Sequence, residues 1–289
     1  MKRFSLVALL LSVFLGCMAN PSGKFTTRTY KLSDFTGIQV SNVVKVVYTQ
    51  GDKYEVKLTG RTDWLDLMEV TSAGGMLKVK AKKTKAFNRV KKQDQPDGSH
   101  NFILRLTAPS LQDINLSGVS TFEGKHLAMD NLNLHLEGVS KFKADAIKCN
   151  DMRLSLIGVS KMEVGSVKCK NIDANIEGAS KVELPDVSQG QKAVFHVVGA
   201  SKLNLTAEFS EQLQVKLVGA SKSDLTFKGG NLSAYCTGAS HLEAEVRCKE
   251  VDAKCYGASK IELSGAAGKV KTDKDGVASK INTSDLKKM

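Results

Sequence analysis

The phrase Gly-Val/Ala-Ser-Lys returns at a fixed step and constrains this chain more than any other feature. Complete copies occupy residues 138–141, 158–161, 178–181, 199–202, 219–222 and 257–260. Variants occupy residues 118–121 and 238–241, and a copy with one inserted residue occupies residues 276–280. The step is about 20 residues, and a fixed period of this size is the signature of a solenoid.

One repeat, residues 132–149, contains three short runs in which apolar and polar residues alternate. The apolar positions are Leu132, Leu134 and Leu136, then Phe142 and Ala144, then Ile147 and Cys149. Alternation with a period of two predicts strands with one buried face. Because no helical spacing of apolar residues occurs, the repeat favours a β-helix over a leucine-rich horseshoe.

Aligned repeats place similar apolar residues in columns. The positions two residues before each glycine hold Leu116, Leu136, Leu156, Ile176, Val197, Leu217, Cys236 and Cys255. Coils stacked in register would turn each column into a ladder of like side chains. Since crossovers between parallel strands are nearly always right-handed, we expect an all-β fold, a right-handed parallel β-helix of about 20 residues per coil.

The residues of the repeated phrase predict a sharp corner in each coil. Glycine tolerates a positive φ, which a sharp corner needs. We expect the serine hydroxyl to bond to the corner backbone or to the serine one coil away. The lysine should face solvent beside an acid two residues later, so that the two columns compensate each other's charge. These acids are Glu123, Glu163, Glu183, Asp224, Glu243 and Glu262.

Residues 25–110 lack the repeated phrase of residues 111–289, and they predict an N-terminal antiparallel β region. Residues 43–49 and 54–59 flank 50–53, which predicts a hairpin. A helical turn is expected within 63–68, and further strands within 76–82 and 102–107. The first coil of a solenoid exposes an unpaired edge, so this region is expected to cap it, with ligand binding as the alternative role.

Residues 1–16 predict a lipoprotein signal peptide. Lys2 and Arg3 precede an apolar run of about 12 residues at 4–15, which is too short to span a bilayer. Leu15-Gly16-Cys17 resembles a bacterial lipobox in which Cys17 is lipidated, with residues 17–24 as a tether. Cleavage after Ala19 is the alternative. We therefore expect attachment to the outer membrane through a lipid anchor alone, with the periplasmic side favoured over the surface.

A basic segment is the candidate ligand surface. Its residues are Lys78, Lys80, Lys82, Lys83, Lys85, Arg89, Lys91 and Lys92. Together with the formal net charge of +12, it favours an anionic polysaccharide or another envelope polymer as partner. The alternative is a charged strand end that runs into a loop. Nucleic acid is not expected as a partner, because the expected envelope location is the wrong compartment and Phe87 is the one aromatic residue within the segment.

No catalytic constellation, cofactor motif or metal motif is evident. His135 and His196 lie three coils apart, which is too far to share a metal. Asp224, Glu243 and Glu262 stack on adjacent coils, and acidic clusters serve β-helical polysaccharide lyases and hydrolases, so a carbohydrate-active enzyme is the alternative reading. Cys149, Cys169 and Cys248 share one column, Cys236 and Cys255 another, and buried free thiols are expected.

One family resemblance is specific. Residues 32–41, which include Phe35-Thr36-Gly37-Ile38, then residues 43–51, then Ala108-Pro109 leading into Gly118-Val119-Ser120, resemble the putative auto-transporter adhesin head GIN-domain family of Bacteroidetes. The resemblance covers most of the chain after residue 17. It implies a β-helical envelope protein that is not an enzyme and has an adhesin-like binding role, and it implies no catalytic or binding residues.

Overall fold

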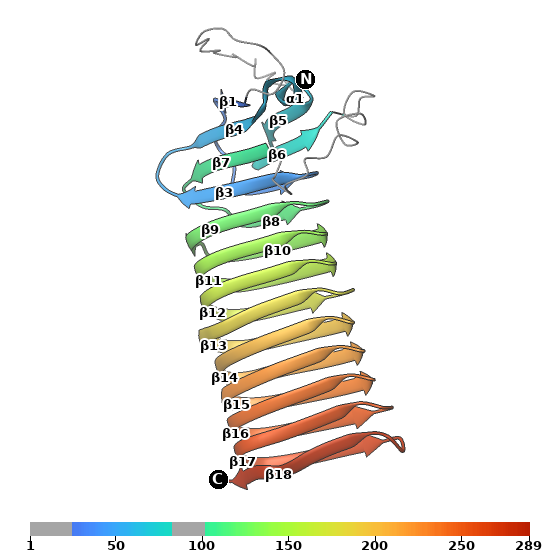
Figure 1. The fold of residues 1–289 in the computed structure, drawn as a ribbon. Coiled ribbons are helices and arrows are strands. Elements are labelled where there is room, and N and C mark those ends of the chain that lie inside the picture. Colours follow the sequence, from blue (N-terminus) through green and yellow to red (C-terminus); the bar gives the residue numbers. More distant parts are fainter. Residues whose placement is uncertain (1–24, 83–101) are drawn as a thin grey trace, which may run out of the picture.

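The computed structural model describes residues 25–82 and 102–289. Its strands stack one above another into a rod, with the N-terminal elements gathered at one end and the C-terminus at the other (Figure 1). The N-terminal elements are β1 Phe25–Tyr30, β2 Gly37–Val40, β3 Val44–Gln50, β4 Glu55–Arg61, α1 Thr62–Leu65, β5 Met68–Ala73, β6 Met76–Ala81 and β7 Phe102–Ala108.

The rod itself is built from eleven further strands, counted over the described residues. They are β8 Asp113–Leu116, β9 Thr121–Ala128, β10 Asn131–Gly138, β11 Lys141–Gly158, β12 Lys161–Ile176, β13 Lys181–Gly199, β14 Lys202–Gly219, β15 Lys222–Gly238, β16 His241–Tyr256, β17 Lys260–Asp275 and β18 Lys280–Lys288. From β11 to β17, a strand begins just after each Gly-x-Ser corner and runs round most of one coil, whereas β18 covers about half a coil.

Neighbouring coils pair in parallel and in the register that the repeats predict. Leu136 lies opposite Leu156, and Gly138 lies opposite Gly158. The fold is therefore a parallel β-solenoid of about nine turns with about 20 residues each, as predicted. The stacking explains the repeat, because each column of the sequence becomes a ladder of identical environments.

Within a coil, the three predicted inward sets are all buried. β11 buries Phe142 and Ala144, then Ile147 and Cys149, then Met152, Leu154 and Leu156. Two consecutive outward residues, at 145–146 and at 150–151, separate the sets where the chain turns. The predicted short strands are thus segments of one long strand, whose pairing with β12 continues round two of the three corners.

The third corner is the glycine corner, and its predicted geometry is confirmed. Gly138 has φ +82°, Gly158 +93° and Gly178 +88°. The following serine is buried and donates its hydroxyl to a carbonyl three residues back, as in Ser140 Oγ to Glu137 O at 2.8 Å. The serine thereby satisfies a carbonyl that the turn would otherwise leave unpaired inside the rod.

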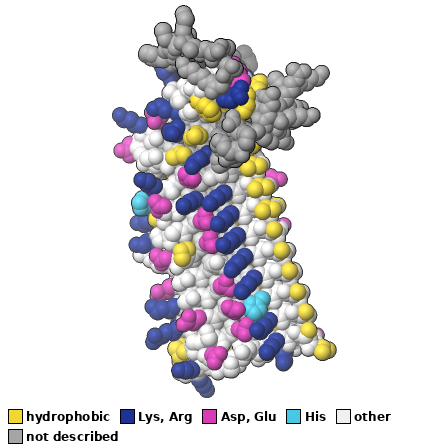
Figure 2. Space-filling view, in the orientation of Figure 1, with side chains coloured by type: hydrophobic (Ala, Val, Ile, Leu, Met, Phe, Trp, Pro, Cys, Tyr) yellow, Lys and Arg dark blue, Asp and Glu magenta, His cyan; other side chains and the backbone are white. Residues whose placement is uncertain are grey.

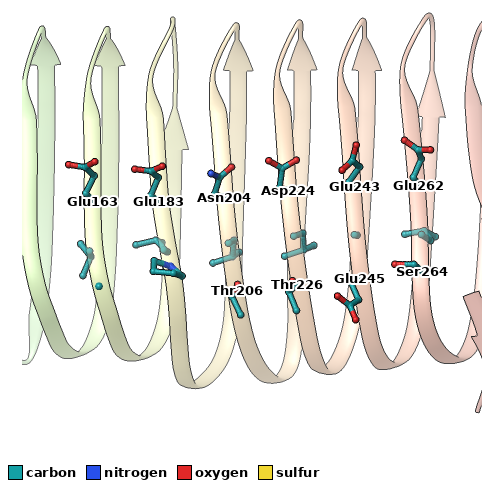
Figure 3. Close-up of a pocket in the computed structure, with 18 of the residues that line it drawn as sticks. Glu163, Glu183, Asn204, Thr206, Asp224, Thr226, Glu243, Glu245, Glu262 and Ser264 are labelled. Carbon is teal, nitrogen blue, oxygen red and sulfur yellow. The ribbon is translucent and has the colours of Figure 1, made fainter. Parts of the chain in front are cut away.

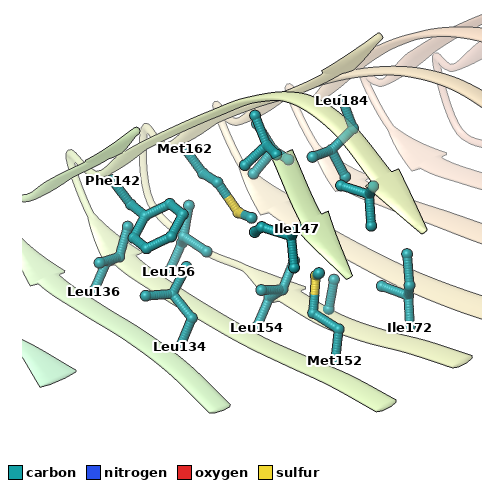
Figure 4. Close-up of a cluster of buried hydrophobic side chains, with 14 of the residues drawn as sticks. Leu134, Leu136, Phe142, Ile147, Met152, Leu154, Leu156, Met162, Ile172 and Leu184 are labelled. Carbon is teal, nitrogen blue, oxygen red and sulfur yellow. The ribbon is translucent and has the colours of Figure 1, made fainter. Parts of the chain in front are cut away.

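The core is a single narrow column of aliphatic side chains with a few aromatic rings. Leu134, Leu136, Phe142, Leu154 and Leu156 point into the space between the walls (Figure 4). Phe122 and Phe142 stack in adjacent coils with ring centroids 4.9 Å apart and planes 7° apart. Small side chains fill the rest, which agrees with an aromatic content of only 6%.

The N-terminal region mixes parallel and antiparallel pairing. β2 extends the ladder of β8, and β3 extends that of β9, both in parallel. β6 and β7 then stack in parallel on β2 and β3. The parallel ladders therefore continue across the expected limit between residues 110 and 111, and only β1, β4 and β5 are antiparallel to their neighbours.

The predicted hairpin between residues 43–49 and 54–59 is wrong. Both strands exist as β3 and β4, but β7 lies between them, parallel to β3 and antiparallel to β4. The solenoid core decides this arrangement, because β3 needs a parallel partner that continues the stack. The predicted helical turn near Trp64 is present as α1, and the predicted strands at 76–82 and 102–107 are present as β6 and β7.

Candidate functional site

A ladder of ion pairs runs along the outside of the rod beside the glycine corner. Lysines and acids lie side by side down its length (Figure 2). Lys141 Nζ lies 2.8 Å from Glu163 of the next coil, and Lys161 pairs with both Glu163 and Glu183. Lys202 reaches Asp224 at 3.0 Å in the same way. The lysines therefore bridge successive acids, and the predicted charge compensation is confirmed.

These pairs hold the acids ionised. Hydrogen bonds from Lys141 and then Lys161 lower the pKa of Glu163 to about 2. A hydrogen bond from Lys260 lowers the pKa of Glu262. The lysine column is consequently neutralised along most of its length, and it does not present the uncompensated positive charge that an anionic polymer would need.

A groove runs along the acid column, on the side away from the ladder lysines. Its volume is about 940 Å³, and its lining spans coils from β11 to β18. One edge carries the stacked side chains Glu163, Glu183, Asn204, Asp224, Glu243 and Glu262, and a second row carries Thr206, Thr226, Glu245 and Ser264 (Figure 3). Buried aliphatic residues such as Leu205 and Leu225 also border the groove.

The groove continues towards the N-terminal end. A second hollow of about 500 Å³ is lined by Tyr48, Gln50 and Glu123, and it shares Lys143 and Asp145 with the first. Carboxylates, amides and hydroxyls occur along both linings, so the groove offers many hydrogen-bond acceptors.

A glycosidase needs one carboxyl group that can act as a general acid. Asp224, Glu243 and Glu262 stack on adjacent coils, as predicted. A general acid needs a raised pKa, yet each carboxyl group with a resolved shift in the described residues has a lowered one. Asp224 and Glu262, whose pKa values are lowered, are therefore poor proton donors at neutral pH.

The predicted basic surface is only partly within the described residues. Lys78 and Lys80 face solvent on β6, and Lys82 is exposed just after it. Lys80 lies 3.6 Å from Glu69, and Lys82 donates to the carbonyl oxygen of Asp66 at 2.7 Å. Lys83, Lys85, Arg89, Lys91, Lys92 and the candidate lipidation site Cys17 lie outside the described residues.

The five described cysteines are free and buried, in agreement with the expectation. Cys149 and Cys169 are stacked with their sulfur atoms 3.2 Å apart. Burial raises the pKa of Cys236 to about 12 and that of Cys248 to about 11, so these thiols remain protonated.

Two features of the structure were not predicted from the sequence. The groove arises because the outward positions after each acid are small or polar, such as Thr206 and Thr226, and this column could have been noticed. The second feature is a cluster of His241, Glu243 and Glu262, whose side-chain ligand atoms lie within 4.8 Å of one another. The signal for it is the histidine that replaces lysine in one copy of the repeated phrase.

Comparison with known proteins agrees with this architecture. A family model described as putative auto-transporter adhesin, head GIN domain, matches residues 34–223 and 210–288. The chain belongs to this family. The family resemblance found in the sequence is thereby confirmed. No match was found among curated proteins.

Three solved structures of similar fold come from Parabacteroides species. A protein described as a putative adhesin from Parabacteroides distasonis has a TM-score of 0.58 at 15% identity, covering 92% of this chain and 98% of its own. A putative adhesin from Parabacteroides merdae has a TM-score of 0.53 at 16% identity, covering 93% and 97% respectively. A putative lipid binding protein from Parabacteroides distasonis has a TM-score of 0.50 at 14% identity, covering 91% and 98%. At these identities the likeness establishes the fold alone.

Proposed function

We propose that this chain is a non-catalytic, adhesin-like binding module of the cell envelope that holds an extended, uncharged glycan in the groove. The observation that carries the proposal is the continuity of the groove, which presents similar polar edges in successive coils from β11 to β18. Stacked strands repeat about every 4.8 Å. A sugar unit in an extended glycan is of similar length, so successive units can meet equivalent side chains.

The charge of the groove selects among polymers. Its edges carry Glu163, Glu183 and Glu243, whereas the lysines that line it within the described residues are Lys143 and, in the second hollow, Lys125. Carboxylates accept hydrogen bonds from sugar hydroxyls, and the lysines of the ladder are already paired with these acids, so little free positive charge is left to attract an anionic ligand. A neutral glycan is therefore the class that the groove accommodates best.

A binding assay with paired variants tests this function. Replacing Thr206 and Thr226 by arginine places two long side chains in the groove. Replacing Gln214 and Ser233 by arginine makes the same charge change on outward positions of the same two strands, β14 and β15, away from the groove lining. We expect wild-type binding on a glycan array to be lost in the first variant and kept in the second. Equal binding by both variants would refute the groove as the site.

A second candidate is the basic surface around β6 as a site for an anionic envelope polymer. It is supported by the exposed side chains of Lys78, Lys80 and Lys82. Replacing Lys82, Lys83, Lys91 and Lys92 by glutamine should then weaken binding far more than glutamine at four ladder lysines. Binding should also fall steeply with salt, because charges are screened over about 8 Å at physiological ionic strength. Equal losses, or indifference to salt, would exclude this surface.

The proposed location in the cell envelope is supported by the N-terminal residues and by the family. The adhesin description of the family fits an envelope-associated protein, and the lipobox-like sequence at Cys17 provides an anchor. No helix in the described ranges is long and apolar enough to cross a membrane. Attachment is proposed to be by lipid, at the outer membrane, on the periplasmic side.

A carbohydrate-active enzyme remains the competing class and has its own test. Incubation of the protein with the glycan that it binds should leave the chain length of that glycan unchanged. Shortened products that disappear in a Glu243→Gln variant would replace the binding function with a catalytic one.

A further inference from the structure

The β16 coil departs from the ion-pair ladder. At the position where β11 to β15, β17 and β18 begin with lysine, β16 begins with His241. Its Nε2 atom lies 3.0 Å from Glu243 Oε1 and 3.3 Å from Glu262 Oε2. An imidazole, whose neutral form offers a lone pair to a metal ion, thus occupies the place of an ammonium group, which has no lone pair.

The spacing of these atoms resembles the edges of a metal polyhedron. Ligands bound to zinc at about 2.0–2.1 Å in tetrahedral arrangement lie roughly 3.3 Å from one another. The two distances from His241 are close to that value, and all three side chains are partly exposed at 27–53%. The cluster is therefore accessible and needs little rearrangement to converge on one ion.

We propose that His241, Glu243 and Glu262 form a binding site for a divalent transition cation, with Zn²⁺ as the best match. One imidazole and two carboxylates are the donors that zinc accepts, whereas Mg²⁺ and Ca²⁺ prefer oxygen ligands alone. Three protein ligands leave a further coordination position open. Glu243 and Glu262 also line the groove, so this position is available to a hydroxyl group of a ligand there.

Two lysines set the strength of the site. Lys260 Nζ lies 2.7 Å from Glu262 Oε2, and Lys222 Nζ lies 3.9 Å from Glu243 Oε1. A bound cation must displace Lys260 from that oxygen, and both ammonium groups repel it. Both lysine side chains are long and 37–47% exposed, so they can swing into solvent. The affinity is accordingly below that of a closed structural zinc site.

The test is titration of the purified chain with Zn²⁺ by calorimetry, with Mg²⁺ as the comparison cation. His241→Lys restores the residue found in the neighbouring coils, so the fold is expected to persist. His196→Lys is the matched control, because His196 is an exposed histidine on β13 outside the cluster. We expect one zinc site in the wild type and in His196→Lys, at least tenfold weaker binding in Glu262→Gln, and none in His241→Lys.

Thermal unfolding supplies a second readout. Zinc should raise the unfolding temperature of the wild type and of His196→Lys but not that of His241→Lys, because only a ligand that binds the folded state stabilises it. Zinc binding that survives in His241→Lys would place the metal elsewhere, for example at cysteines. Absence of zinc binding by the wild type would mean that the cluster is an ordinary histidine–carboxylate ion pair. Either result overturns the proposal.

Discussion

Gly178 lies so close to Gly158 of the preceding coil that any β-carbon on Gly178 would overlap the Gly158 carbonyl oxygen. That oxygen accepts a hydrogen bond from the backbone N–H of Ala179 at 2.8 Å. The corner glycine is thus required twice, once for its φ of +88° and once for the close approach of two backbones.

Gly178→Val should therefore destabilise the protein by more than about 3 kcal/mol, because the steric overlap adds to the backbone strain of about 1–3 kcal/mol. Gly75→Val is the control, since Gly75 has φ +76° but nothing lies within 4 Å of its added β-carbon. It should lose only the strain. Urea unfolding of the two variants measures the difference, and equal losses would show that the overlap relaxes without cost.

Replacement of Ser221 and of Ser223 by alanine should have opposite effects on stability, although both serines are buried. Ser221 Oγ donates to Val218 O at 3.0 Å and lies 3.2 Å from Gly199 O. Ser223 Oγ has no hydrogen-bond partner in the described residues and sits in an apolar column between Leu203 and Leu242. Ser221→Ala should cost about 1 kcal/mol, whereas Ser223→Ala should stabilise by up to about 1 kcal/mol. Unfolding midpoints that move in the same direction would contradict this assignment.

Glu163 gives the ladder a measurable pH dependence. Its pKa falls from 4.5 to about 2 in the folded state, so its contribution to stability is present above pH 4.5 and disappears as the pH falls towards 2. At pH 7, Glu163→Gln should lose about 0.5–1 kcal/mol, since the pair is partly exposed. The loss should vanish at low pH. Glu245→Gln, at an acid without an ion pair in the described residues, should show no such change, and a parallel pH profile for both would count against the ladder.

The buried cysteines should resist alkylation until the rod unfolds. Thiolate is the reactive form, and burial keeps Cys236 and Cys248 protonated with pKa values of about 12 and about 11. Mass spectrometry after iodoacetamide treatment should find Cys149, Cys169, Cys236, Cys248 and Cys255 unmodified in buffer and modified in denaturant. Rapid labelling in buffer would indicate that the coils open readily.

We predict that Cys17 carries lipid and that this lipid anchors the chain to the membrane. Protein purified from membranes should have Cys17 as its N-terminal residue, with a mass increase for three acyl chains, since one chain alone anchors weakly. Cys17→Ser should release the protein from the membrane fraction. An unmodified chain beginning at Asn20 would instead establish ordinary signal-peptide cleavage.

The sequence by itself determined the solenoid. Alternation at Leu132, Leu134 and Leu136 defines a buried face, and the return of Gly-x-Ser at a step of about 20 residues sets the coil length. Register follows, because a shift would move whole columns of apolar residues out of the core. The φ of the corner glycines and the pairing of lysine with acid were predictable for the same reason, since each depends only on residues at equivalent positions of successive coils.

The tertiary structure decided what depends on contacts outside the repeat. β3 and β4 are adjacent in sequence, yet β7 lies between them, because the parallel stack offers β3 a better edge than a hairpin does. The groove forms only when the coils stack, because its lining is contributed by successive coils from β11 to β18. The cluster at His241 needs Glu262 from the next coil, and only the stacking of β17 on β16 brings that carboxylate within 3.3 Å of the imidazole.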